Sequence, residues 1–162
     1  MFSTIFQQEL KYWFKKPAFY IYLAIFLGLS FFLSAGTAGL FDSVTVTTGS
    51  SRIVNSPSGV NGLFNALTIF IFFLFPSIIG VSIYRDFKSE MHTILYSYPF
   101  TKSNYLFAKF YSGIVVVSII VLSIAIGMFI GFRFPGTNSD IVGNFQLITY
   151  VKAYLVFILP NI

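Results

Sequence analysis

The sequence predicts an all-α integral membrane protein, with an interfacial N-terminal helix, three transmembrane helices and the start of a fourth. Only 9% of the 162 residues are charged and 56% are hydrophobic, whereas about a quarter of the residues of a soluble domain are charged. Uncharged stretches of about 20 residues, the length that crosses a bilayer, recur between short polar segments. A soluble domain so poor in charge could not cover its surface, so we set that alternative aside.

Residues 2–16, "FSTIFQQELKYWFKK", have the pattern of an amphipathic helix. The apolar side chains recur at spacings of three and four and share one face: Phe2, Ile5, Phe6, Leu10, Trp13 and Phe14. The other side is polar: Gln7, Gln8, Lys11 and Lys15. This pattern favours a helix lying in the membrane surface, with its lysines toward anionic head groups. The alternative is a cytoplasmic extension of the first span.

Three uncharged segments predict transmembrane helices: residues 18–36, 63–84 and 111–132. Tyr20 and Tyr22 lie near the start of the first, where amphipathic rings prefer the membrane interface. A cleaved signal peptide is the alternative for this first segment, because the small residues "SAGTAG" follow it. The length of its apolar run and its amphipathic leader favour a span.

Individual residues in these spans carry further expectations. Pro76 removes a backbone hydrogen bond and should kink the second helix. Asn65 lies near the start of that helix and could bond to another helix or face a substrate. Gly127 and Gly131 have the small-xxx-small spacing that allows close contact between membrane helices.

The chain turns apolar again over residues 151–162, a segment too short to span a bilayer. We interpret it as a truncated fourth helix. The whole chain, residues 1–162, is then a partial transmembrane domain, and we expect it to be the N-terminal piece of a longer protein or a truncated gene product.

Basic residues indicate which end of each span is cytoplasmic, because Lys and Arg accumulate in cytoplasmic loops. One set lies in the N-terminal segment and in the interval 85–110: Lys11, Lys15, Lys16, Arg85, Lys88, Lys102 and Lys109. The remaining three lie in or beside the other two loops: Arg52, Arg133 and Lys152. The N-terminus and the 85–110 loop are therefore predicted to be cytoplasmic, with residues 37–62 and 133–150 outside.

The composition offers little for catalysis. There is no cysteine, and His92 is the single histidine, so a metal cluster is not expected. Asp86 and Glu90 share a helical face, but we expect them to form surface ion pairs with Arg85 and Lys88 rather than to act as an acid and a base. No phosphate-binding loop, no charge within a span and no basic stripe for nucleic acid is present. We therefore predict no enzyme activity and no cofactor.

The charged interval 85–110 is expected to be a coupling loop, because "RDFKSEMHTILYSYP" can form a short amphipathic helix that Pro99 ends. One face of this helix is apolar: Phe87, Met91, Ile94 and Leu95. Most of its charges fall elsewhere. Such a helix could transmit a push into the two spans that it joins, or it could rest on the lipid surface without a partner. The pattern alone leaves both open.

Several segments resemble the permease subunits of ABC transporters of the ABC-2 type. They are "FQQELKYWFKKPAFYIY", "NSPSG", "IGVSIYRDFKSEMHTILYSYPFTKSNYLFAKF" and the late "LPN". The group that they resemble contains large bacterial permeases, in which a membrane half can be joined to an aminopeptidase-like domain. The resemblance covers nearly the whole chain and is weakest in the outer loops. A complete permease half has about six spans, so this chain is shorter than the family pattern.

The resemblance implies a function and partners. Residues 2–16 would be the connecting helix, and residues 86–98 a coupling helix that docks on a separate ABC ATPase subunit. The residues expected to bind that subunit are Arg85, Asp86, Phe87, Lys88, Glu90, Met91, Ile94 and Leu95. A second permease copy or half would complete the path across the cell inner membrane, and export is the expected direction. One alternative is a non-transport membrane anchor or assembly protein. Another is an intramembrane enzyme, but the lack of ionisable groups in the spans argues against it.

Overall fold

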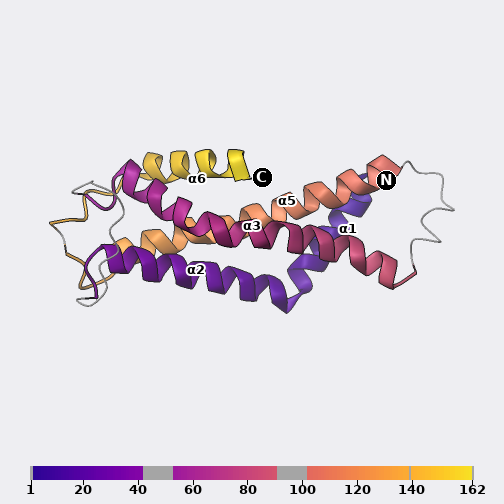
Figure 1. The fold of residues 1–162 in the computed structure, drawn as a ribbon, viewed down its shortest axis with the longest axis horizontal. Helices are drawn as coiled ribbons and strands as arrows, with labels where there is room; N and C mark the ends of the chain where they lie inside the picture. The colour runs from indigo at the N-terminus through magenta and orange to yellow at the C-terminus, as the bar shows by residue number, and fades with distance from the viewer. Residues whose placement is uncertain (1, 42–52, 91–101, 139, 162) are drawn as a thin grey trace.

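The computed structural model describes residues 2–41, 53–90, 102–138 and 140–161. These parts of the chain form five helices and no strand (Figure 1). The helices are α1 (Phe2–Lys15), α2 (Pro17–Thr37), α3 (Pro57–Lys88), α5 (Lys102–Phe132) and α6 (Leu147–Asn161). Three of them, α2, α3 and α5, are long and apolar enough to cross a membrane. The predicted all-α membrane fold is thereby confirmed.

The helices extend beyond the uncharged segments that predict them. α3 begins at Pro57 and ends at Lys88, and α5 begins at Lys102. The start of α3 is stabilised by Ser56, whose hydroxyl accepts a hydrogen bond from the amide of Gly59 at 3.2 Å. At the other end, charged residues continue both helices because they have partners there, as described below. α6 begins at Leu147, before the apolar segment expected from residue 151.

α2 and α5 pack closely along their length, and Gly127 and Gly131 lie at the contact. A Cβ atom on Gly127 would come within 2.0 Å of Ser30 Oγ and 2.5 Å of the Leu27 carbonyl oxygen. A Cβ atom on Gly131 would come within 2.0 Å of Ser34 Oγ. Each glycine therefore faces a serine of the opposite helix, and both helices use the same spacing of small residues. The predicted close helix contact is confirmed.

α3 is one continuous helix through Pro76. Asn65 is exposed on it, so this side chain does not pack between the described helices. The helix ends at Lys88, and the amide of the following residue, Ser89, donates to the Arg85 carbonyl at 3.0 Å. Glu90 follows with φ 53°, a left-handed backbone that turns the chain away from the helix axis.

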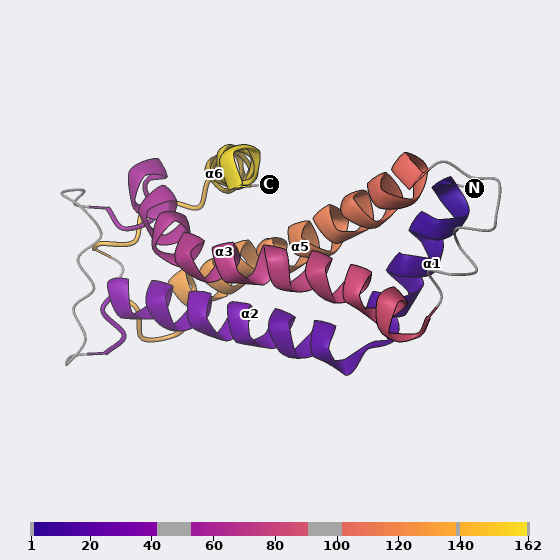
Figure 2. The same ribbon diagram turned by 45° about the vertical axis from the view of Figure 1, so that its right-hand side comes forward.

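The two ends of the bundle are formed by different parts of the chain. α1, the end of α3 and the start of α5 lie together at the right-hand end of Figure 1. The described residues that directly follow α2 and α5, 38–41 and 133–138, lie at the opposite end, and Figure 2 shows the same separation. There, Val54 and Asn138 bond through their amides to the carbonyls of Ile141 and Ala38, each at 3.0 Å. The helices that carry most of the basic residues thus meet at one end.

Candidate functional site

Four charged side chains from three helices meet at the α1 end of the bundle. This charge cluster consists of Glu9 from α1, Arg85 and Asp86 from α3, and Lys109 from α5. Glu9 Oε1 lies 2.6 Å from Arg85 Nη2 and 3.1 Å from Lys109 Nζ. Asp86 Oδ2 lies 2.5 Å from Lys109 Nζ, and Asp86 Oδ1 lies 3.3 Å from Arg85 Nε. Each carboxylate therefore contacts both cations, and the formal charges balance.

The cluster is largely shielded from solvent. The side chains of Lys109, Glu9 and Asp86 are 1%, 5% and 9% exposed, and that of Arg85 is 29% exposed. Moving a single ion into such a place costs several kcal/mol, which only its partners offset. The four groups therefore depend on one another.

Polar neighbours complete the coordination of the carboxylates. The Ser82 hydroxyl donates to Glu9 Oε2 at 2.9 Å, and the Tyr105 hydroxyl donates to Asp86 Oδ2 at 2.5 Å. Lys109 Nζ also donates to the Ser82 carbonyl at 2.6 Å. This last bond joins the start of α5 to α3 through the backbone.

Tyr12 covers the partly exposed side of the cluster. Its ring centroid lies 3.8 Å from the Arg85 guanidinium carbon, a cation–π contact that favours the charged group. Burial raises the pKa of the Tyr12 hydroxyl, but the neighbouring cations Lys16 and Arg85 outweigh it and lower that pKa below its ordinary value. The surroundings of Tyr12 are therefore electropositive.

Helical spacing explains how the chain brings these groups together. On α3, Ser82 and Asp86 are one turn apart, as are Tyr105 and Lys109 on α5. On α1, Glu9 and Trp13 are the two buried residues, and they too are one turn apart. Two polar residues from α3, two from α5 and Glu9 from α1 thus reach the same point.

The packing of α1 has one feature that the sequence did not predict. Glu9 is buried in the bundle, whereas Phe2 and Phe14 of the predicted apolar face are exposed. The reason is that α1 packs on α5, where Glu9 meets two cations. The exposed rings leave an apolar edge on α1, which is compatible with the predicted contact to lipid.

Arg85 and Asp86, which are also predicted to bind a partner, belong to the charge cluster. Asp86 pairs with Arg85 as expected, but the expected surface location is wrong, because Asp86 is 7% exposed and also contacts Lys109 and Tyr105. Residues 85–88 also belong to α3 and do not begin a separate helix. The helix continues there because its charges have partners.

The other predicted partner-binding residues have a different placement. Phe87, Lys88 and Glu90 are exposed at the same end. Met91, Ile94 and Leu95, like His92, lie outside the described residues.

Sequence reasoning missed Glu9, Tyr12, Tyr105 and Lys109 as members of the site. One signal was present: Glu9 falls one turn from Ile5 and one turn from Trp13, within the apolar face of the predicted helix. A carboxylate at such a position requires a buried partner. Its partners could not be identified, because they lie on helices that are remote in sequence.

The carboxylates of the cluster are paired with cations and hydroxyl groups that belong to the same helices. Among the described residues, no group of three or more His, Cys, Asp or Glu side chains could hold a metal ion. The arrangement is suited to holding three helix ends together. Comparison of the chain with family models, with curated proteins and with solved structures finds no match.

Proposed function

We propose that the protein is a membrane-spanning permease component of an ATP-driven transporter, in which the charge cluster transmits movement from the α3–α5 connection to the spans. The observation that carries this proposal is the junction of α1, α3 and α5 through four mutually paired charges. A force applied to either end of the α3–α5 connection would reach Asp86 or Lys109 directly. Glu9 would pass it to α1.

The placement of charge supports the same proposal. The end that carries the cluster also carries α1, the end of α3 and the start of α5, and with them the larger set of basic residues. By the positive-inside tendency this end is cytoplasmic, where an ABC ATPase subunit would dock. A second copy or half would complete the translocation path, and the inner membrane is the proposed location. The ABC-2 resemblance of the sequence points to the same partner.

The proposal is tested by co-purification from detergent-solubilised membranes. In the full-length protein, residues 91–98 are replaced by a Gly/Ser linker of equal length, which leaves α3 and the charge cluster unchanged. The matched control replaces residues 43–50, between α2 and α3, in the same way. ATP hydrolysis in the purified fraction identifies an associated ATPase, whose subunit is then sequenced.

We expect an ATP-hydrolysing subunit with the wild type and the 43–50 control, and its loss with the 91–98 replacement. Absence of ATPase activity from the wild-type fraction would reject the proposal and favour a membrane anchor or assembly protein. Retention of the ATPase by the 91–98 replacement would show that the α3–α5 connection is not its docking site.

A further inference from the structure

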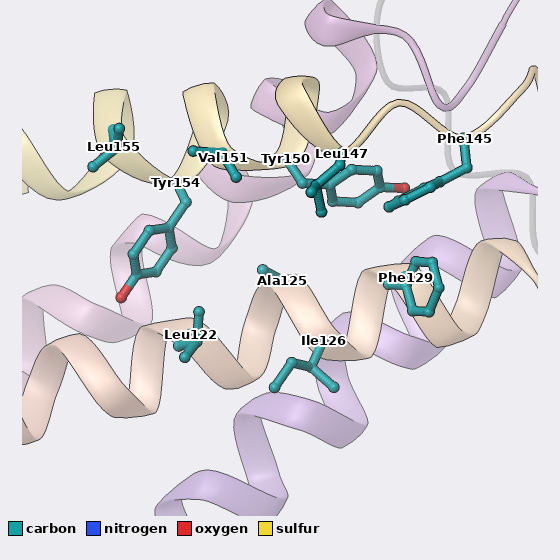
Figure 3. A pocket seen from close by; sticks show the side chains of 10 residues that line it. All are labelled: Leu122, Ala125, Ile126, Phe129, Phe145, Leu147, Tyr150, Val151, Tyr154 and Leu155. Carbon is teal, nitrogen blue, oxygen red and sulfur yellow. The ribbon is translucent and has the colours of Figure 1, made fainter.

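We infer that the groove between α5 and α6 binds one anionic phospholipid, with its phosphate at Arg133 and one acyl chain between the two helices. The groove lies at the end of the bundle opposite the charge cluster and does not depend on the proposed transport function. Its volume is about 420 Å³, within the range of ligand-binding cavities. Figure 3 shows the side chains that line it from α5, from α6 and, with Phe145, from the segment just before α6.

The body of the groove is apolar. Leu122, Ala125 and Phe129 line it from α5, and Val151 and Leu155 line it from α6. Leu122 and Leu155 are 45% and 54% exposed, so the groove opens to the side of the bundle. In a membrane that side faces lipid, and hydrocarbon is the chemistry that fits the lining.

One end of the groove is polar. A second cavity of about 130 Å³ shares Phe129, Phe145 and Tyr150 with the groove, and its own lining includes Arg133, Asn55 and Asn144. The Arg133 guanidinium carbon lies 5.6 Å and 5.7 Å from the ring centroids of Phe129 and Phe145. The cation thus lies beside two rings that line the apolar groove.

Arg133 has no described acidic partner. Among the residues that the structure describes, no carboxylate oxygen lies within 4.0 Å of its guanidinium group. A guanidinium group donates paired hydrogen bonds that match the oxygens of a phosphate. An anionic head group would therefore complete the polar end.

The length of the groove fits one leaflet. From Phe132, the residue before Arg133, to Leu122, α5 rises about 15 Å at 1.5 Å per residue, and half of the hydrocarbon core is about 15 Å thick. Beyond Leu122, the Tyr154 hydroxyl donates to the Ser118 carbonyl at 2.6 Å, and this bond joins α6 to α5. The groove thus runs from the membrane interface toward the bilayer centre, where that bond ties its two walls together.

A phospholipid fits this combination better than an apolar helix of another polypeptide. Such a helix would cover the apolar lining, but it would also bury Arg133 without an anion, which is unfavourable. A lipid supplies the hydrocarbon and the phosphate in the required order along the bundle axis.

The test uses full-length protein and counts retained lipid by native mass spectrometry after exchange into mixed phosphatidylglycerol and phosphatidylcholine. Arg133→Gln removes the cation, and Lys152→Gln is its control, since Lys152 is exposed on α6 and lines neither cavity. Ala125→Phe fills the groove, and Ile130→Phe adds similar bulk at an exposed position of α5 outside it.

We expect Arg133→Gln to lower phosphatidylglycerol retention about five-fold, corresponding to about 1 kcal/mol for one interfacial cation. Ala125→Phe should lower retention of both lipids, and the two controls should match the wild type. Unchanged retention in both Arg133→Gln and Ala125→Phe would overturn the inference.

A second measurement does not depend on the folding of any variant. Wild-type protein is irradiated with phosphatidylglycerol that carries a diazirine in its acyl chain, and the labelled peptides are mapped. Label in residues 121–132 and 147–156, reduced by excess unlabelled phosphatidylglycerol, supports the site. Label on the exposed α3 surface around Ile69 without label in these segments would reject the lipid site.

Discussion

The carboxylate of Glu9 lies 3.1 Å from the ammonium group of Lys109, and both side chains are at most 5% exposed. Glu9 is on α1 and Lys109 is near the start of α5, so this contact fixes the N-terminal helix to a span. Neither side chain is exposed enough for water alone to stabilise its charge. Substitutions of Glu9 and Lys109 are therefore expected to have strongly coupled effects on the free energy of unfolding.

Lys109→Met should lower the free energy of unfolding by about 3–5 kcal/mol, because it leaves Glu9 and Asp86 buried with one cation between them. Combining it with Glu9→Gln should recover part of that loss. The double-mutant cycle is measured by unfolding in mixed detergent and should give a coupling of about 1–3 kcal/mol. Lys88→Met, at an exposed position of α3, is the control and should change stability little. Additive effects of the two single variants would contradict the coupling.

Tyr105→Phe should lower the free energy of unfolding by about 1.5–3 kcal/mol, the range for a hydrogen bond to a charged group. Its hydroxyl donates to Asp86 at 2.5 Å, and the phenylalanine would leave that carboxylate with one neutral donor fewer. Tyr84→Phe is the matched control, since Tyr84 is 66% exposed on α3. The same detergent unfolding assay compares the two. Equal stability of both variants would show that the Tyr105 hydroxyl contributes nothing.

Hydropathy predicts where α2, α3 and α5 lie, because a span must be apolar over a fixed length. It misplaces their ends, because a helix does not stop at its first charge when that charge has a partner. Asp86 shows the difference: its sequence neighbours suggest a solvated loop, yet Lys109 and Tyr105 bury it. Gly127 and Gly131 could be recognised because their spacing is local. Glu9 could be recognised as anomalous on an apolar face, but pairing it with Arg85 and Lys109 requires the packing of three helices.

Ser56→Ala should lower the free energy of unfolding by about 1 kcal/mol, because it removes the side-chain cap at the start of α3. Without the hydroxyl, the Gly59 amide loses its acceptor at 3.2 Å. Ser77→Ala, at an exposed position within the same helix, is the control and should be neutral or slightly stabilising. Hydrogen exchange of the first turn of α3 reports the effect locally. Protection of the Gly59 amide that is unchanged by Ser56→Ala would argue against the cap.

Gly127→Ala should lower the free energy of unfolding by about 1–3 kcal/mol, because the new methyl group would overlap Ser30 Oγ and the Leu27 carbonyl oxygen. The carbonyl is backbone, so α2 must move away from α5 to admit the methyl group. Gly28→Ala is the matched control: it lies on α2, and nothing stands within 4 Å of its added Cβ. That variant should be as stable as the wild type or up to about 1 kcal/mol more stable, since alanine favours a helix over glycine. The two variants are compared by thermal unfolding in the same detergent. If Gly127→Ala were stabilised as much as Gly28→Ala, the close approach of α2 and α5 at this glycine would be incorrect.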